Sequence, residues 1–357
     1  MPPPAGARRH YASTSRLPRD RASPVLNEIL QDEPAIGVIV VNWKRAADTL
    51  ACLDSLANAK RGPARIVVVD NASGDESVAR IREWATARKV SFALFREADL
   101  AGIKPEEMRS ESMLSYLTVI VSSTNKGFSG GNNLGLRLFG HDRHLTHFLL
   151  LNNDATVRED FFAELKRGLA SAADAGVLTG TIYNYPATET VWYAGGHVVP
   201  FRGLIVHDLD VPDDGNLRPT GFVSGCVMLI SRALFETIGP LPECYFPGYS
   251  EDAEYCSRAT RSGFKLLYAP RAVAFHKVGA TAGAASASPY VTQVQVRHRV
   301  LYVRRNFRGT DRVVALSYLA ATKMARALVE TMKGKPEMGR AFLKGALEGF
   351  FSRSRGD

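Results

Sequence analysis

Short runs of β-branched and leucine residues recur along the first 160 residues. The runs are IGVIVV, IVVV, LTVIV and FLLL, at residues 36–41, 66–69, 117–121 and 148–151. Unbroken apolar runs of this length are typical of strands buried on both faces of a parallel sheet. Helical spacing separates the first runs, with Asp48 and Asp75 placed to cap those helices. The pattern predicts an α/β fold, an open, twisted and mainly parallel sheet with helices on both faces.

Polar residues stand at the carboxyl end of each predicted strand. They are Asn42, then Asp70-Asn71, then Asn125-Lys126-Gly127, and finally Asn152-Asn153-Asp154. The carboxyl edge is where open α/β sheets bind ligands. One such cluster is equally well explained as a turn, because Asn, Asp and Gly favour turns. Four of them at one edge favour a ligand site.

Composition excludes several classes of protein. The chain has 357 residues, enough for one large domain or two with a sizeable core. No apolar stretch is long enough to span a membrane, and residues 1–33, rich in Pro and Arg, lack the apolar segment of a signal peptide. The four cysteines are widely spaced, without a CxxC pair. We therefore expect a disordered N-terminal tail and a cytoplasmic protein without disulfides.

The positive charge is concentrated in the last fifth of the chain. Residues 286–357 carry 14 Lys and Arg against 5 Asp and Glu, whereas the preceding residues are neutral overall. Helical spacing there predicts basic amphipathic helices. Their predicted polar faces are Thr322, Lys323, Arg326, Glu330 and Lys333, and then Arg340, Lys344 and Glu348, which lie opposite Phe342, Leu343, Leu347 and Phe350. Such helices either pack on the main domain or dock on an anionic membrane surface. Nucleic acid is not expected as a partner, because no known binding module is present.

Seven segments, in order, resemble the motifs of family 2 glycosyltransferases, in particular bacterial rhamnosyltransferase-like members. They are VVNWK (40–44), VVVDNASGD (67–75), NKGFSGGNNLG (125–135), LLLNNDA (149–155), SGCVMLI (224–230), YSEDAEYCSRATRSGFKLLYAP (249–270) and FHKVGATAG (275–283). The resemblance covers about residues 35–310. It implies a GT-A fold, a nucleotide-sugar donor, a divalent metal and inversion at the anomeric carbon. It divides the chain into a nucleotide-sugar-binding half (34–160), an acceptor-binding and catalytic half (161–285) and a basic helical region (286–357).

The resemblance assigns donor binding to the strand ends. Asp70 matches the family's nucleotide-binding Asp, whose carboxylate accepts hydrogen bonds from a base or ribose. The other donor-binding candidates are Asn42, Asn71, Asn125, Gly127, Gly131, Asn132 and Asn153. The glycines would let the backbone approach a ligand closely, and Asn132 would offer its amide near the start of a helix. Taken alone, this segment is equally consistent with a glycine-rich turn.

The resemblance places a metal site at Asn152-Asn153-Asp154, the position of the family's DXD motif. Asn152 replaces the first acid, which leaves Asp154 as the certain carboxylate ligand. His276 matches a histidine that completes the metal site in some relatives. An imidazole beside one carboxylate would favour Mn²⁺ over Mg²⁺. The alternative is that His276 is a histidine of the core.

Glu251 and Asp252 are the catalytic candidates. Ser250 is placed to cap a helix that stops at Gly263, and a helix dipole would keep both acids ionised. An inverting transfer needs a base for the acceptor hydroxyl, and family position selects Asp252, with Glu251 orienting the acceptor. The alternative is that both acids only favour a helix start. The aromatic segment 245–249 could form a platform for a sugar, and Arg297 and Arg299 could contact the diphosphate.

Two rival functions were weighed. Residues 127–131 satisfy G-x-S-x-G, and Ser129, Asp252 and His276 follow the chain order of an α/β-hydrolase triad. A nucleophile elbow should follow its strand directly, however, and here residues 123–126 intervene. The other rival is an inactive sugar-nucleotide-binding protein. We predict instead an inverting glycosyltransferase that moves a sugar, with rhamnose favoured, from a dTDP or UDP donor to a lipid-linked or polysaccharide acceptor in cell-surface glycan synthesis, peripheral on the inner face of the cytoplasmic membrane.

Overall fold

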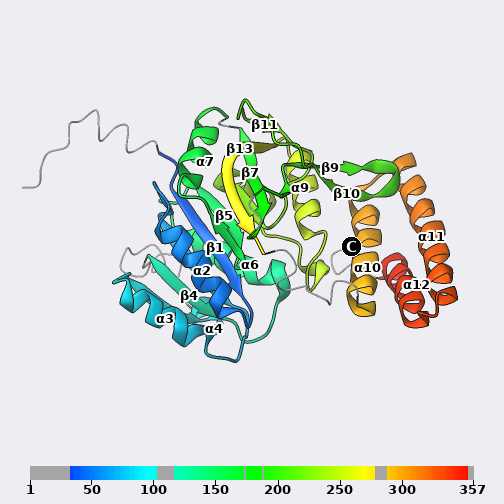
Figure 1. The fold of residues 1–357 in the computed structure, drawn as a ribbon, viewed down its shortest axis with the longest axis horizontal. Coiled ribbons are helices and arrows are strands. Elements are labelled where there is room, and N and C mark those ends of the chain that lie inside the picture. The colour runs from blue at the N-terminus through cyan, green and yellow to red at the C-terminus, as the bar shows by residue number, and fades with distance from the viewer. Residues whose placement is uncertain (1–32, 103–115, 173, 187–188, 278–287, 353–357) are drawn as a thin grey trace, which may run out of the picture. The chain divides into compact units, whose positions relative to one another are not determined.

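The computed structural model describes residues 33–102, 116–172, 174–186, 189–277 and 288–352. The predicted N-terminal tail lies outside these residues, apart from Glu33. An 11-stranded sheet runs through the molecule in the order β11-β13-β7-β12-β5-β1-β2-β4-β3, with β6 paired to β13 and β8 paired to β7 (Figure 1). The sheet is mainly parallel, as the apolar runs predicted.

The parallel part of the sheet contains all four predicted strands. Its strands are β1 (Ile36–Asn42), β2 (Arg65–Asp70), β3 (Phe92–Arg96), β4 (Leu117–Val121) and β5 (His147–Asn152). Its helices are α2 (Ala46–Ala57), α3 (Ser77–Ala87), α4 (Glu97–Gly102) and α6 (Gly127–His141). The predicted cap Asp48 is wrong, because α2 begins two residues earlier and Asp48 instead pairs with Lys277 at 2.8 Å. Asp75 does support its helix, since its carboxylate accepts the Ser77 N–H at 2.9 Å.

Helices α2 and α6 cover opposite faces of β1. A Cβ on Gly131 of α6 would lie 2.8 Å from Val41, and one on Gly135 would lie 2.6 Å from Ile39. Successive strand residues point to opposite faces. Asn42, the next residue after Val41, accordingly points the other way and bonds to Thr49 of α2. The absence of a Cβ therefore lets α6 lie close against the sheet.

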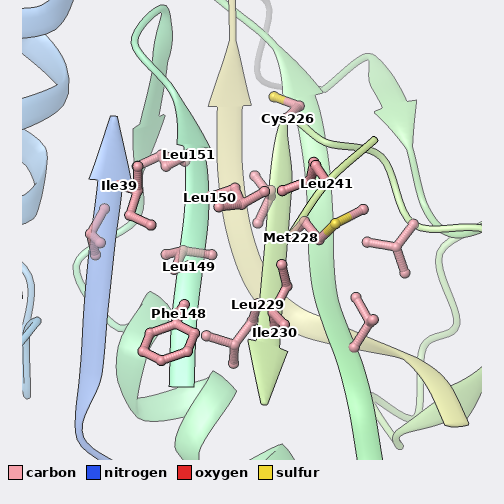
Figure 2. Close-up of a cluster of buried hydrophobic side chains, with 14 of the residues drawn as sticks. Ile39, Phe148, Leu149, Leu150, Leu151, Cys226, Met228, Leu229, Ile230 and Leu241 are labelled. Atoms are coloured by element: carbon pink, nitrogen blue, oxygen red, sulfur yellow. The ribbon is translucent and has the colours of Figure 1, made fainter. Parts of the chain in front are cut away.

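The second part of the sheet is mixed. Its strands are β6 (Ala155–Val157), β7 (Ala175–Asn184), β8 (Val191–Tyr193), β11 (Arg218–Pro219), β12 (Val227–Ser231) and β13 (Lys265–His276), with β9 (Gly196–Val199) and β10 (Leu204–His207) as a separate hairpin. Its helices are α7 (Phe161–Ala170), α8 (Arg232–Ile238) and α9 (Glu251–Arg261), and short 3₁₀ turns cover Pro200–Arg202 and Glu243–Tyr245. β12 lies antiparallel between β5 and β7, and their side chains form a core with β1 (Figure 2).

The C-terminal region forms helices α10 (Pro289–Asn306), α11 (Gly309–Met332) and α12 (Pro336–Phe351), which lie side by side (Figure 1). α12 packs on α10 through small residues, since a Cβ on Gly349 would lie 2.6 Å from Val300. The apolar face predicted for α12 therefore does not all pack inward, and Leu343 and Leu347 are exposed. Within the described ranges, no helix combines the length and apolar character needed to cross a bilayer.

The polar face predicted for α11 is also wrong in part. Glu330 is buried and pairs with Arg326 at 3.0 Å, whereas apolar side chains on another face of α11 are exposed. These are Val313, Val314, Met324, Leu328 and Met332. The buried face of α11 consists of Ala315, Leu319, Ala327 and Glu330, which leaves these five apolar side chains outside the contact.

Candidate active site

A chain of hydrogen bonds joins the carboxyl ends of three neighbouring strands. Asn153 Nδ2 donates to Thr49 Oγ1 at 3.2 Å, and that hydroxyl donates to Asn42 Oδ1 at 2.7 Å. Asn42 Nδ2 then donates to Asp70 Oδ1 at 2.9 Å. All four side chains are buried, and Asn42 is completely inaccessible. Asn42 therefore positions Asp70 rather than touching a ligand itself.

Asn71 ties the end of β2 to the turn that follows β4. Its Nδ2 donates to Asn125 Oδ1 at 3.1 Å and to the Gly127 carbonyl at 3.0 Å. Its Oδ1 accepts the Lys126 N–H at 2.9 Å. The predicted gathering of four polar clusters at one edge is thus confirmed. Trp43, which follows β1 at this edge, is 42% exposed, and the Lys44 ammonium lies over its ring, 5.4 Å from the centroid.

The glycine-rich segment contradicts its predicted role as a donor cradle. The helix begins at Gly127, so Gly131 and Asn132 lie inside α6 and are buried. Gly131 faces Val41, as described above, and a Cβ on Gly127 would lie 2.6 Å from the Pro247 carbonyl oxygen. Asn132 donates to a carbonyl of the preceding helical turn. These three residues serve packing within the protein.

A cleft of about 720 Å³ opens at the end of β5. Its lining brings together the predicted metal and catalytic residues Asn152, Asp154, Glu251, Asp252 and His276. They come from the β5–β6 turn, the first turn of α9 and the last residue of β13. Residues that lie more than 100 positions apart in the sequence therefore share one cleft.

Asp154 and His276 face each other in this cleft. His276 Nε2 lies 3.1 Å from Asp154 Oδ1, and each side chain is less than a tenth exposed. The register of β13 and β6 sets His276 opposite Ala155, which explains the pairing. Burial opposes protonation of His276, but Cys226 and the hydrogen bond to Asp154 outweigh it and raise its pKa to about 10. His276 Nδ1 is buried without a hydrogen-bond partner in the described structure.

This pair suits a divalent cation as part of a ligand set. A carboxylate oxygen and the nitrogen of a neutral imidazole both bind Mn²⁺, so a cation would bind here with loss of a proton from His276. In the part of the chain that is described, no group of three or more His, Cys, Asp and Glu side chains is placed to hold a metal. Asp154 and His276 would be two of the ligands of such a cation.

Glu251 and Asp252 begin α9 and differ in their surroundings. Asp252 Oδ2 accepts the Gly225 N–H at 3.1 Å, and its Oδ1 accepts the Ala253 N–H at 2.8 Å. Glu251 Oε2 is buried with no described partner. Burial raises the pKa of Asp252, whereas burial together with Asp252 raises that of Glu251 well above its usual range. The expectation that the helix dipole keeps both acids ionised is thus wrong for Glu251, and Asp252 ionises first.

The turn before α9 has an unusual backbone. Tyr249 and Ser250 have φ of 77° and 78°, a left-handed conformation that costs a residue other than glycine about 1–3 kcal/mol. Ser250 stands at the N-cap, but in this conformation its hydroxyl makes no capping bond, contrary to expectation. Tyr249 lines the cleft. Tyr245, predicted to join an aromatic platform, is instead buried against Glu254.

Helix α10 holds this turn in place. His298 is completely buried, and burial together with Arg297 lowers its pKa to about 4, so the ring is neutral. Since Arg297 donates to Nε2, the proton lies on Nδ1, which donates to the Gly248 carbonyl at 2.7 Å. The predicted diphosphate contacts fare differently. Arg297 donates to the Phe246 carbonyl and does not line the cleft, whereas Arg299 lines it but donates to backbone carbonyls of the β9–β10 turn.

The hydrolase alternative does not fit this geometry. Ser129 is the third residue of α6, buried inside the helix rather than at a strand-to-helix elbow. It does not line the cleft, and His276 pairs with Asp154.

Sequence reasoning missed several residues that line the cleft. Trp192 stacks edge-on with His207 and His276, with ring centroids 4.7 and 4.8 Å apart. Gln295 reaches the cleft from α10. Gly225, in the quoted SGCVMLI segment, donates to Asp252. The SGCVMLI motif could have pointed to Gly225 as a residue of the site. No sequence pattern indicated that Trp192 or the β9–β10 hairpin would line the cleft.

No family model matches the chain. Over 250 residues it is 26% identical to the low-salt glycan biosynthesis hexosyltransferase Agl10 of Haloferax volcanii, covering 69% of this chain and 67% of that protein. The relative is thus a hexosyltransferase, in agreement with the resemblance to glycosyltransferases.

Three solved structures have a similar fold. GalNAc-T7 with UDP, GalNAc and Mn²⁺ matches with a TM-score of 0.56 at 14% identity, over 76% of this chain and about half (48%) of that one. The fold is GT-A. The mannosyltransferase PcManGT of Pyrobaculum calidifontis, in complex with GDP-Man and Mn²⁺, matches with a TM-score of 0.50 at 16% identity, over 90% of this chain and 88% of that one. TarS 1–349 of S. aureus matches with a TM-score of 0.51 at 14% identity, over 88% of this chain and 80% of that one.

Proposed function

We propose that this protein is an inverting, metal-dependent glycosyltransferase of family 2 that moves a sugar from a nucleoside diphosphate to a lipid-linked or polysaccharide acceptor. One observation carries the proposal: a single cleft holds the Asp154–His276 pair together with Glu251 and Asp252. The similarity to a glycan biosynthesis hexosyltransferase supports the reaction class. The presence of UDP or GDP-Man with Mn²⁺ in the matched structures supports the donor and metal classes.

Asp252 is the base in this proposal. Its carboxylate takes the proton of the acceptor hydroxyl while that oxygen forms a bond to the anomeric carbon. The bond from this carbon to the diphosphate oxygen breaks, and the diphosphate leaves with the electron pair. Attack from the face opposite the leaving group inverts the anomeric configuration. Burial raises the pKa of Asp252, which makes its carboxylate a stronger base.

Glu251 orients the acceptor in this proposal, and Asp154 and His276 bind the metal. The raised pKa of Glu251 keeps a proton on its carboxyl, which can donate to an acceptor oxygen and orient it. Asp154 and His276 would hold a divalent cation, which when bound neutralises charge on the leaving diphosphate. Asp70, which is 3% exposed, and Trp43, which is 42% exposed, are the proposed nucleotide contacts at the edge where the strand ends meet.

A thermal-shift panel of dTDP, UDP and GDP, each with Mn²⁺ or with EDTA, tests this function. A ligand that binds only the folded state raises the melting temperature. We expect one nucleotide to stabilise the protein in a Mn²⁺-dependent manner, with dTDP favoured by the resemblance to rhamnosyltransferases. Absence of any shift would refute the donor site. The anomeric configuration of the product, read by NMR with the matching sugar donor, tests inversion.

We also propose that the C-terminal helices dock on an anionic membrane surface. α11 and α12 expose apolar side chains, among them Leu328 at 62% and Leu347 at 57%, in the region that carries the net positive charge. An apolar face flanked by basic residues binds anionic bilayers. Inserting one leucine side chain into the bilayer contributes about 1.5–3 kcal/mol to the free energy of membrane binding. L328S/L347S should therefore reduce sedimentation with phosphatidylglycerol vesicles by at least about tenfold.

The matched control for this test is L94S/L209S, which removes two exposed leucines from other parts of the chain. It should sediment with the vesicles as the wild type does. Equal sedimentation of L328S/L347S and wild type would exclude the docking face.

A further inference from the structure

A second pocket, of about 690 Å³, is lined by five arginines. They are Arg258, Arg261, Arg304, Arg305 and Arg312, drawn from α9, α10 and the start of α11. Glu254 is the one acidic residue of the described lining. The lining therefore carries a formal charge of +4, against +9 for the whole chain. None of these residues lines the cleft described above.

Glu254 forms an ion pair with Arg305. Its carboxylate accepts three hydrogen bonds from Arg305, at 2.9, 3.1 and 3.2 Å, and its side chain is buried. The other four guanidinium groups make no ion pair with a described residue. Their positive charges are therefore not compensated by a neighbouring carboxylate, although like charges in one pocket repel each other.

Three of these four arginines are held by neutral oxygens. Arg258 donates to the carbonyls of Ile238 and Pro240. Arg261 donates to the side-chain oxygen of Asn306 at 3.0 Å. Bonds of this kind fix the position of a guanidinium group without cancelling its charge.

Arg304 extends the same arrangement to the last helix. Its Nη1 donates to the carbonyls of Gly349 and Ser352, at 2.8 and 3.0 Å, at the end of α12. A guanidinium group has five N–H donors, so each of these arginines keeps donors for a further acceptor. The pocket thus presents fixed, charged donors before any ligand arrives, which lowers the entropic cost of binding.

We propose that this pocket binds a diphosphate group. Arginine recognises phosphate oxygens through paired, charge-assisted hydrogen bonds. A phosphate carries about −1.5 to −2 at pH 7, so two phosphates are needed to match the charge of the lining. The volume lies within the range of small-molecule sites. The group belongs either to a phosphorylated lipid, since Arg312 adjoins the exposed Val313 and Val314, or to a soluble diphosphate. This site goes beyond the proposed transferase reaction.

Calorimetric titration of the full chain with inorganic pyrophosphate tests the site. EDTA is present throughout, so that metal-dependent binding in the cleft does not contribute. The variant is R261Q/R312Q, because both side chains are exposed and their loss leaves the buried Arg305–Glu254 pair intact. We expect the wild type to bind one pyrophosphate and the variant to bind it at least about tenfold more weakly. R261K/R312K, which keeps the charge, should recover part of the affinity.

The matched control is R137Q/R143Q, which removes the same charge from exposed positions in α6 and the turn after it. It should bind pyrophosphate as the wild type does. Unchanged affinity in R261Q/R312Q, an equal loss in the control, or no binding by the wild type would overturn the proposal.

Two further readouts identify the source and separate the two proposals. If R261Q/R312Q also loses binding to phosphatidic acid vesicles, the ligand is a lipid. If vesicle binding is retained while pyrophosphate binding is lost, the ligand is a soluble diphosphate. The Mn²⁺-dependent nucleotide shift should be the same in R261Q/R312Q and wild type. Its absence from both, with pyrophosphate binding intact, would refute the transferase and leave this pocket standing.

Discussion

Replacing Asp252 by Asn removes the base while keeping the size of the side chain. Two backbone N–H groups, those of Gly225 and Ala253, donate to the carboxylate at 3.1 and 2.8 Å. Asn offers a single oxygen, so one N–H loses its acceptor, at a cost of about 1–3 kcal/mol. Removing a charge next to Glu251 offsets part of this cost. We therefore expect a folded protein, with a change in the free energy of unfolding below about 2 kcal/mol.

The rate of transfer should respond far more strongly than the stability. A positioned general base contributes about 10²–10⁴-fold, and we expect kcat of D252N to fall by that factor. Donor affinity, measured by the thermal shift with nucleotide and Mn²⁺, should stay within about threefold, because Asp252 acts on the acceptor. Since burial raises the pKa of Asp252, the wild-type rate should rise with pH through a value above the usual Asp range. A D252N variant that transfers sugar within tenfold of wild type would refute Asp252 as the base.

Three other substitutions test the site. D154A should abolish the Mn²⁺-dependent part of the nucleotide thermal shift, and an unchanged shift would exclude Asp154 as a metal ligand. Burial raises the pKa of Glu251 above its unfolded value of 4.5, so its contribution to stability is present below that pH and lost as pH rises through the folded pKa. E251Q should consequently gain in melting temperature over wild type as pH increases, and parallel pH profiles would contradict this. N71A removes three hydrogen bonds, one of them buried and two partly buried, and should lower the free energy of unfolding by about 2–4 kcal/mol in urea titrations; a loss near zero would show that Asn71 does not tie the two strand ends.

The strands and the edge at which their polar residues meet could be predicted from the sequence. Each predicted strand is present within one residue at either end, because an unbroken apolar run has few alternatives to a buried strand. That Asp154 and His276 lie together was also predicted, as an implication of the resemblance to family 2 glycosyltransferases. What links Asn42 to Asp70 was not, because a local pattern does not show which strands are neighbours.

Glycine explains why two of the predictions were wrong, the donor cradle and the apolar face of α12. The sequence does not distinguish a glycine that lets a ligand approach from one that lets a helix approach a sheet. Only the fold shows that Gly131 faces Val41. In α12, Gly349 packs against α10 and leaves the apolar side chains of Leu343 and Leu347 exposed. Hydrophobic periodicity assumes that the largest apolar residues are the buried ones, and here the smallest are.

The hydrogen bond from His298 to the Gly248 carbonyl limits where the chain can be truncated. The net positive charge begins at residue 286, and a truncation there would be the obvious way to isolate a smaller catalytic fragment. Such a fragment would lack α10 and with it the support of the turn at Tyr249 and Ser250. The left-handed backbone of that turn would then relax, and Asp252 would lose its fixed position. A minimal active fragment must therefore extend at least through α10.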